Sequence, residues 1–276
     1  MIAGAHTAEV GRRGLDRRPW YGEDGDVGRR LFGSILSIAL VGGSLIAPVP
    51  VSANHGADAL LPDIGMAPLA DFSVQKRPKG ERWLRFSATI VNVGAGPFQA
   101  FGHTNVGGEL SVDQQFRTSS GGIVSHPTNA RMYFSGDGHN HWHVRDLEQY
   151  VLESQNGATR LYGEKHGFCF WDNVRYSPSL PDYPLYAVYT GSNSCVTRGD
   201  GTVLMGLSIG WGDRYPATIT DQYINITNLP AGEYTVTATA DWAHWFEESN
   251  GANNSTTARI RISKNGVTVL NPGIGP

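Results

Sequence analysis

Three histidines at alternating positions are the part of this sequence best suited to chemistry. His139, His141 and His143 are separated by single residues. In an extended chain, alternate side chains project from the same face, so the three imidazoles can approach one metal ion. Neutral imidazoles bind copper, zinc, nickel or iron(II), and three of them leave a coordination position for water or a substrate. The residues therefore predict a metal site and leave the identity of the metal open.

The spacing of these histidines requires a curved backbone. In a straight strand the outer two Cα atoms would lie about 13 Å apart, whereas metal–nitrogen bonds are about 2.0 Å long. Gly136 and Gly138, directly upstream, permit the curl that convergence needs. The alternative is a group of surface or core histidines that bind no metal.

The elements that must position these histidines are predicted to be strands. Short runs rich in Val, Ile, Thr, Tyr and Phe recur between Gly, Pro and Asn, while helical periodicity is scarce. Asn265 and Gly266 form a strong hairpin signal. The clearest strands are 82–93, 131–134, 142–153, 222–227, 233–241 and 256–263. We predict an all-β fold, an antiparallel β-sandwich with long functional loops such as 173–206.

The N-terminal region resembles an export signal. Arg29 and Arg30 precede an apolar stretch at 31–46, and small residues follow at 51–53. We expect residues 1–53 to be a signal with a long n-region, cleaved after Ala53. The apolar stretch is shorter than the roughly 20 residues that span a bilayer, so no stable membrane anchor is expected. The arginine pair is also compatible with twin-arginine export. The predicted location is secreted or extracytoplasmic.

Charge and cysteine content narrow the class of protein further. Removing the six basic and five acidic residues of 1–53 from totals of 22 and 25 leaves 16 and 20, a formal charge of −4. Such a chain is not expected to bind nucleic acid. In an oxidising compartment Cys169 and Cys195 most simply form one disulfide, and two buried thiols are the alternative.

Several segments together resemble the lysyl oxidase family. The run 139–143, followed by Asp146 and Tyr150, is similar to the copper-binding segment of that family. Residues 165–169 resemble the segment in which a lysine lies three residues before a Phe-Cys pair, and 206–215 resemble the segment that ends in the cofactor tyrosine. The likeness extends over residues 61–263.

The resemblance implies a function and a set of catalytic residues. It implies that His139, His141 and His143 bind copper, and that Lys165 and Tyr215 are the precursors of lysine tyrosylquinone. Such a cofactor is an electrophilic carbonyl that forms a Schiff base with a primary amine. The implied protein is a secreted copper amine oxidase, with a catalytic domain at 54–270, that uses dioxygen to convert primary amines, including peptidyl lysine, to aldehydes, hydrogen peroxide and ammonia.

A second predicted metal site binds calcium. Carboxylate and amide oxygens are hard ligands that calcium prefers, and residues 248–254 resemble a calcium-binding loop of some animal members of the family. Asn250 replaces an aspartate of those members, which predicts weaker calcium binding. The alternative is an Asn-rich turn capped by its own side chains. The candidate ligands are Asp63, Ile64 (by its backbone carbonyl), Glu248, Asn250, Asn253 and Asn254.

Two questions stay open at the level of sequence. Animal members have a histidine where this chain has Gln149, so another base is needed if that histidine transfers protons; the candidates are Asp146, His166 and His244. The alternative functions are a copper- or zinc-binding β-sandwich without turnover, serving metal capture or surface attachment, and a zinc hydrolase with a metal-bound water.

Overall fold

The computed structural model describes residues 58–135 and 140–276. The predicted export segment and His139 lie outside the described residues. The described residues belong to one compact unit. In the described part of the chain, regular structure consists of strands and two single-turn 3-10 helices, η1 (Pro78–Gly80) and η2 (Gly251–Asn253). The all-β prediction is confirmed.

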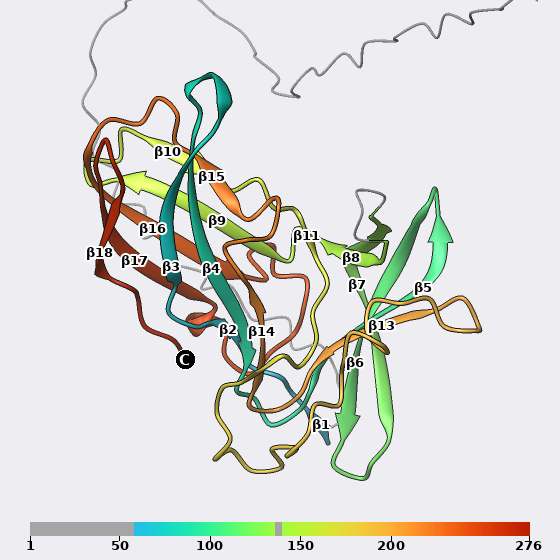
Figure 1. Cartoon of the computed structure of the whole chain (residues 1–276). Helices are drawn as coiled ribbons and strands as arrows, with labels where there is room; N and C mark the ends of the chain where they lie inside the picture. Colours follow the sequence, from blue (N-terminus) through green and yellow to red (C-terminus); the bar gives the residue numbers. More distant parts are fainter. Residues whose placement is uncertain (1–57, 136–139) are drawn as a thin grey trace, which may run out of the picture. The chain divides into compact units, whose positions relative to one another are not determined.

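The largest sheet of the described residues has seven strands, all paired antiparallel. Their order is β11-β8-β7-β6-β5-β13, and β1 pairs with β6 (Figure 1). The strands are β1 (Ala59–Leu60), β5 (Phe98–Val106), β6 (Glu109–Thr118), β7 (Ile123–Phe134), β8 (Trp142–Arg145), β11 (Gly167–Phe168) and β13 (Val203–Leu207).

Two further antiparallel sheets complete the described fold. The order of the first is β10-β9-β16-β17-β18, and in the second β4 pairs with β2, β3, β14 and β15 while β12 pairs with β14. The first comprises β9 (Glu148–Ser154), β10 (Arg160–Tyr162), β16 (Gly232–Ala240), β17 (Ser255–Ile262) and β18 (Val267–Asn271). The second comprises β2 (Ile64–Met66), β3 (Ala70–Lys76), β4 (Arg82–Asn92), β12 (Val174–Arg175), β14 (Trp211–Tyr215) and β15 (Tyr223–Asn225).

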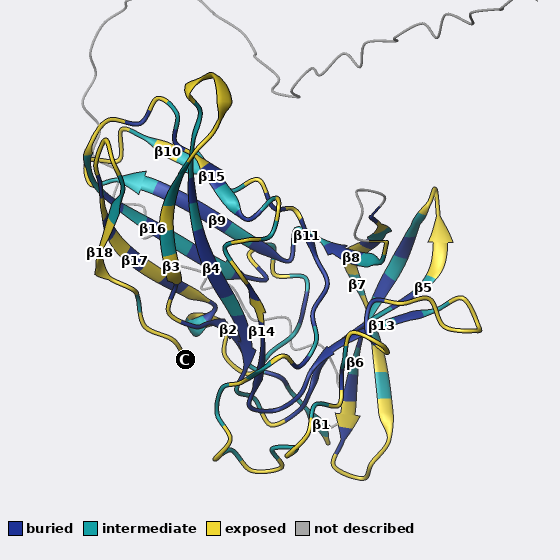
Figure 2. Cartoon of the chain, in the orientation of Figure 1, coloured by how far each residue is buried: buried dark blue, intermediate teal, exposed yellow. Residues whose placement is uncertain are grey.

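The sheets share one hydrophobic core, as expected of a β-sandwich. Buried residues follow β4 along most of its length (Figure 2). Phe86 of β4 packs edge-on against Tyr150 of β9, with ring centroids 5.2 Å apart, and Val236 and Ile260 belong to the same core. Burying each large apolar side chain contributes about 1.5–3 kcal/mol. The interior of the sandwich is therefore built from alternate residues of strands in different sheets.

The main difference from the predicted strands lies at Asp146. A single strand was expected over 142–153, whereas β8 ends at Arg145 and β9 begins at Glu148. Asp146 has a φ of 49°, a left-handed conformation that interrupts the extended backbone of a regular strand. The break sends β8 and β9 into different sheets. The hairpin at Asn265 and Gly266 is confirmed, since it joins β17 to β18.

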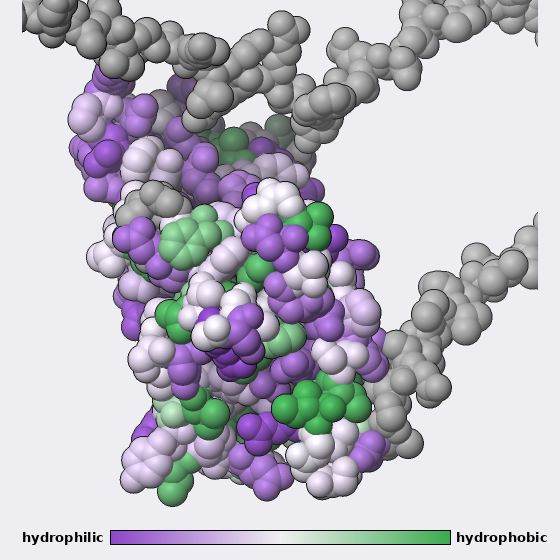
Figure 3. Space-filling model, turned by 90° about the vertical axis from the view of Figure 1, so that its right-hand side faces the viewer, coloured by the Kyte–Doolittle hydropathy of each residue, from purple (hydrophilic) through white to green (hydrophobic). Residues whose placement is uncertain are grey.

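The exposed surface is largely polar on the face drawn in Figure 3, where apolar side chains form separate small patches. Leu185 and Tyr186, in the long loop before β13, are 70% and 80% exposed. Within the described ranges, no helix has the length and apolar character needed to cross a membrane.

The predicted disulfide is confirmed. Cys169 and Cys195 are bonded, with Cα atoms 5.8 Å apart. Cys169 directly follows β11, whereas Cys195 lies in the long loop between β12 and β13. The amide of Trp142 also donates to the carbonyl of Cys195, at 2.9 Å. The disulfide therefore fastens a long segment with little regular structure to the sheet that carries the histidines.

We expect the Cys169→Ser/Cys195→Ser double variant to lose about 2–4 kcal/mol of unfolding free energy, because the unfolded chain gains freedom when the loop is opened. Urea unfolding measures the difference. Wild-type protein kept in reductant is the matched control and is expected to show the same loss. A double variant as stable as the oxidised wild type would contradict this account.

Candidate active site

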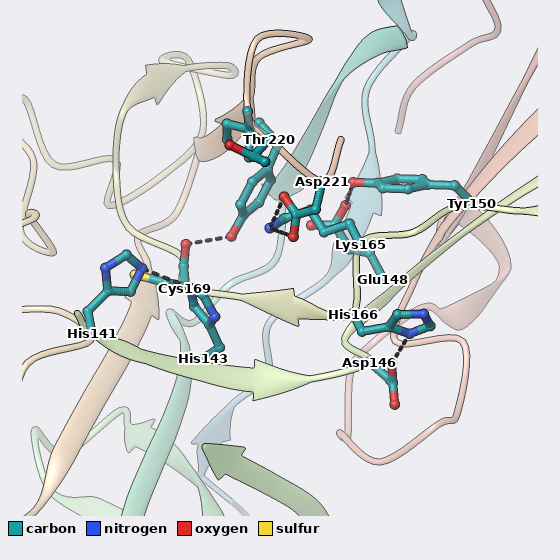
Figure 4. A network of polar contacts seen from close by, with 12 residues as sticks. His141, His143, Asp146, Glu148, Tyr150, Lys165, His166, Cys169, Thr220 and Asp221 are labelled. Carbon is teal, nitrogen blue, oxygen red and sulfur yellow. Dashed lines mark hydrogen bonds and ion pairs between the residues drawn. The ribbon is translucent and has the colours of Figure 1, made fainter. Parts of the chain in front are cut away.

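His141 and His143 point toward each other. Asn140, with a φ of 49°, turns the backbone directly before His141. The Nε2 atoms of the two rings are 2.8 Å apart, and the rings are nearly perpendicular, at 83°. His143 is buried at the start of β8 (Figure 4). The structure thus brings together the two described members of the predicted histidine triad.

This arrangement of nitrogen donors fits a metal ion. Two ligands bound at right angles, each about 2.0 Å from an ion, lie about 2.8 Å apart, a separation that suits the tetragonal sites of Cu(II). In the absence of a metal, the same distance is that of a hydrogen bond from one ring to the other. Among the described residues no set of three His, Cys, Asp or Glu side chains forms a metal cluster. His139 lies outside them.

Lys165 and Tyr215 are neighbours in space although 50 positions separate them in the chain. The Lys165 Nζ atom lies 5.0 Å from the centroid of the Tyr215 ring. Both residues are buried, with 4% and 6% of their surface exposed. The Tyr215 hydroxyl donates to the carbonyl oxygen of Cys169, at 2.5 Å. The structure therefore brings together the two residues that the family resemblance paired.

One cavity joins the two histidines to this pair. Its volume is about 200 Å³, smaller than the pockets that bind drug-sized ligands, which favours a small or slender ligand. Aromatic and aliphatic side chains make up much of its wall. The lining residues are His141, His143, Lys165, Cys169, Trp171, Tyr215 and Ile219.

Strand pairing explains how these residues meet. Lys165 lies just before β11, which pairs with β8, the strand that carries His143. Tyr215 ends β14 and pairs with Ala88 of β4. Glycine is required at position 167, where β11 pairs with β8, because a Cβ atom there would lie 2.7 Å from Nδ1 of His143. Glycine thus lets β11 approach the histidine ring closely.

Glu148 is a buried carboxyl group near Lys165 (Figure 4). Tyr150 donates a hydrogen bond to its Oε2 atom, at 2.6 Å. Burial raises the pKa of Glu148 to about 7, and the hydrogen bond from Tyr150 and the charge of Lys165 offset part of this increase. Burial therefore favours the protonated form of Glu148 up to a higher pH than for an exposed glutamate.

Asp213 is a second buried carboxyl group beside the tyrosine. Burial raises its pKa well above the ordinary value, and the charge of Glu148 adds to this effect. Burial, followed by the charges of Asp213 and Glu148, also raises the pKa of Tyr215 well above its ordinary value. The Tyr215 phenol therefore keeps its proton at neutral pH.

Sequence reasoning missed both buried acids, although strand alternation could have revealed them. Glu148 is two residues before the buried Tyr150 in β9, and Asp213 is two residues before the buried Tyr215 in β14. Alternate residues of a strand face the same side. A carboxyl group on the buried face of a strand is rare and therefore informative.

The candidates for a general base do not line the cavity. Asp146 Oδ1 pairs with Nδ1 of His166 at 2.7 Å, and Figure 4 shows this pair apart from the two metal-ligand candidates. The hydrogen bond that the His166 ring donates to Asp146 raises the pKa of His166, which is exposed. His244 lies in the turn after β16, where its amide donates to the carbonyl of Asp241.

Five of the six predicted calcium ligands take part in hydrogen bonds with one another. Glu248 accepts hydrogen bonds from the amide of Ile64, at 2.9 Å, and from the side chain of Asn254, at 2.6 Å. The Asn253 side chain donates to Asp63, at 2.7 Å. The loop after β16 therefore packs against the segment that leads into β2, although about 190 positions separate them.

Buried oxygens in this loop fit a cation. The side-chain carbonyl oxygens of Asn253 and Asn254 have no hydrogen-bond partner among the described residues. Burial raises the pKa of Glu248 to about 7 and also raises that of Asp63. A bound cation would supply the missing partner of these oxygens. Asn250 instead accepts a hydrogen bond from the amide of Ala252 and caps η2, as the turn alternative predicts for that residue.

Comparison with known proteins identifies the family. The lysyl oxidase family model matches residues 115–272, so this chain belongs to the lysyl oxidase family. Lysyl oxidase homolog 2 of Homo sapiens is 26% identical over 151 residues, and that of Mus musculus is 27% identical over the same length. These alignments cover 54% of this chain and 18% of the relatives' length. The family resemblance predicted from the motifs is confirmed.

The raised pKa of Glu148 predicts how stability depends on pH. In the folded protein this carboxyl titrates near pH 7, and its ordinary pKa is 4.5. Between these values the folded state retains a proton that the unfolded state releases. The unfolding free energy therefore falls as the pH rises through this window, by up to about 1.4 kcal/mol per pH unit.

We expect the Glu148→Gln variant to lack this fall. Its unfolding free energy, relative to that of wild type, should therefore increase by about 1–3 kcal/mol from pH 5 to pH 8. Urea unfolding at both pH values measures the change. Glu153→Gln, a partly exposed position in the same strand, is the matched control and should keep the wild-type dependence. Equal pH dependence in wild type and Glu148→Gln would rule out the proposed titration.

Proposed function

We propose that this protein is a secreted copper-dependent amine oxidase that acts on primary amines, including peptidyl lysine. The proposal rests on a single observation: one cavity is lined by His141, His143, Lys165 and Tyr215. Membership of the lysyl oxidase family supports the same reaction class. The products would be an aldehyde, hydrogen peroxide and ammonia. Export is proposed from residues 1–53, with cleavage after Ala53 and a catalytic domain at 54–270.

The proposed copper ligands are His139, His141 and His143. The facing Nε2 atoms of the two described histidines support this assignment. Copper and a lysine tyrosylquinone derived from Lys165 and Tyr215 would supply the oxidation of the amine by dioxygen and the covalent capture of its nitrogen. The residues of the chain would bind the metal ion and keep the two precursor side chains close together.

The surrounding side chains would position the reacting groups. The carbonyl of Cys169 orients the Tyr215 hydroxyl, and the Lys165 amine lies over the face of the same ring. Trp171 and Ile219 form apolar walls of the cavity, which limit the access of water. A slender alkyl amine fits these walls better than a branched one.

A copper- or zinc-binding protein without turnover is the second candidate. It is supported by the histidine contact, which does not require Lys165 or Tyr215. The two candidates differ in whether a covalent bond joins the last two residues.

We expect copper loading in air to join Lys165 and Tyr215 covalently, because the amine and the ring are held together in one cavity. Intact mass and peptide mapping detect the cross-link, and phenylhydrazine reports the quinone. Lys165→Arg and Tyr215→Phe should abolish both signals, while Lys79→Arg and Tyr162→Phe should retain them. Separate, unmodified peptides after complete copper loading would favour the metal-binding protein.

We also propose that calcium binds the loop formed by Asp63, Ile64, Glu248, Asn250, Asn253 and Asn254. Its affinity would be in the millimolar range of extracellular modules.

We expect 10 mM calcium to raise the melting temperature by several degrees, because a ligand that binds only the folded state stabilises it. Differential scanning calorimetry with calcium and with magnesium measures the effect. Glu248→Gln should lose the increase, whereas Asp200→Asn, which changes an exposed carboxylate in another loop, should keep it. Equal shifts with calcium and magnesium in both variants would show that this loop is not the site.

A further inference from the structure

Asp221 is the carboxylate partner of Lys165. Its Oδ1 and Oδ2 atoms lie 3.5 and 3.4 Å from the Lys165 Nζ atom (Figure 4). The Lys165 side chain is only 2% exposed, whereas that of Asp221 is 33% exposed. The pair therefore joins a buried amine to a carboxylate that is still open to solvent.

Asp221 lies in the loop between β14 and β15, which contributes Ile219 to the cavity wall. This loop runs over residues 216–222, between Tyr215 at the end of β14 and the start of β15 at Tyr223. Ile219, two residues before Asp221, lines the cavity itself. The carboxylate of Asp221 reaches the cavity through its contact with Lys165, which lines the cavity.

Arg85 fixes the backbone of this loop. Its Nη1 atom donates to the carbonyls of Ala217, at 3.0 Å, and Ile219, at 2.6 Å, and its Nη2 atom donates to that of Thr220, at 3.2 Å. Its Nε atom donates to the side chain of Gln75, at 2.6 Å. One guanidinium from β4 therefore donates hydrogen bonds to three backbone carbonyls of the loop and holds Asp221 in place.

Cofactor formation would change the charge that faces Asp221. To bond to the Tyr215 ring, the Lys165 ammonium would release a proton. A C–N bond would then replace a ring C–H bond, the electrons would pass to dioxygen, and the nitrogen lone pair would become conjugated with the ring. Dioxygen is the oxidant in that step, as in the proposed function. The resulting nitrogen is uncharged, so the carboxylate of Asp221 loses its cationic partner. A half-buried carboxylate that has lost its partner attracts a new cation.

We propose that Asp221 recognises the ammonium group of the incoming amine after Lys165 has bonded to Tyr215, and that Arg85 is the positioning residue that holds Asp221 there. This inference rests on the proposed oxidase function. It predicts that the substrate is a slender, cationic primary amine. The ammonium group of this amine replaces the positive charge that Lys165 has lost.

The test compares a cationic substrate with an uncharged probe. In copper-loaded Asp221→Asn we expect KM for n-butylamine to rise about tenfold or more, with kcat changed less than threefold. The rate of reaction with phenylhydrazine, which is uncharged at neutral pH, should stay within a factor of two of wild type. Asp221→Glu should restore most of the affinity for the amine. Glu164→Gln, which removes an exposed carboxylate next to Lys165 in the chain, is the matched control and should leave KM within a factor of two.

The outcomes separate this inference from the proposed function. If wild type does not react with phenylhydrazine, the oxidase function fails. If wild type reacts and Asp221→Asn keeps the wild-type KM, the inference alone fails. Loss of the Lys165–Tyr215 cross-link in folded Asp221→Asn would also overturn it, because Asp221 would then act on Lys165 and not on the substrate. Circular dichroism establishes that the variant is folded.

Discussion

The antiparallel pairing of β4 is the constraint on which the rest of the structure depends. This strand pairs with β2, β3, β14 and β15, and its inward side chains are buried in the shared core. Through β14 it places Tyr215, and through β2 it places Ile64 of the proposed calcium site. Its outward-facing Arg85 holds the loop that contains Ile219. Pairing with the same strand therefore fixes the position of residues in both candidate sites.

Electrostatics at the centre of the molecule are governed by burial. Glu148, Asp213 and Tyr215 are withdrawn from water, and burial is the largest cause of the raised pKa of each. Lys165 is the cation among them, and its charge opposes the increase for both carboxyl groups. Removing charged groups from water destabilises the fold unless they are paired or protonated. Such a cluster is expected where chemistry requires proton transfer, and perturbed pKa values are a feature of active sites.

The two candidate sites differ in the way they would bind a metal. The histidine site lies beside a narrow cavity and presents nitrogen donors, which suit a transition metal. The loop at Glu248 presents carboxylate and amide oxygens, which suit calcium. The first would take part in the proposed reaction, while the second joins two distant segments of the chain and would stabilise the sandwich.

Local patterns in the sequence determined the strands, the hairpin at Asn265 and Gly266, the alternation of the histidines and, through the presence of only two cysteines, the disulfide. Each depends on backbone geometry over a few residues or on simple pairing. The motif resemblance also paired Lys165 with Tyr215, but only the tertiary structure put the amine over the ring. The break at Asp146, the burial of Glu148 and Asp213, and the contact of Asp221 with Lys165 also emerged only there. These features depend on strand register and on the packing of separate sheets, which sum many weak contacts between residues far apart in the chain.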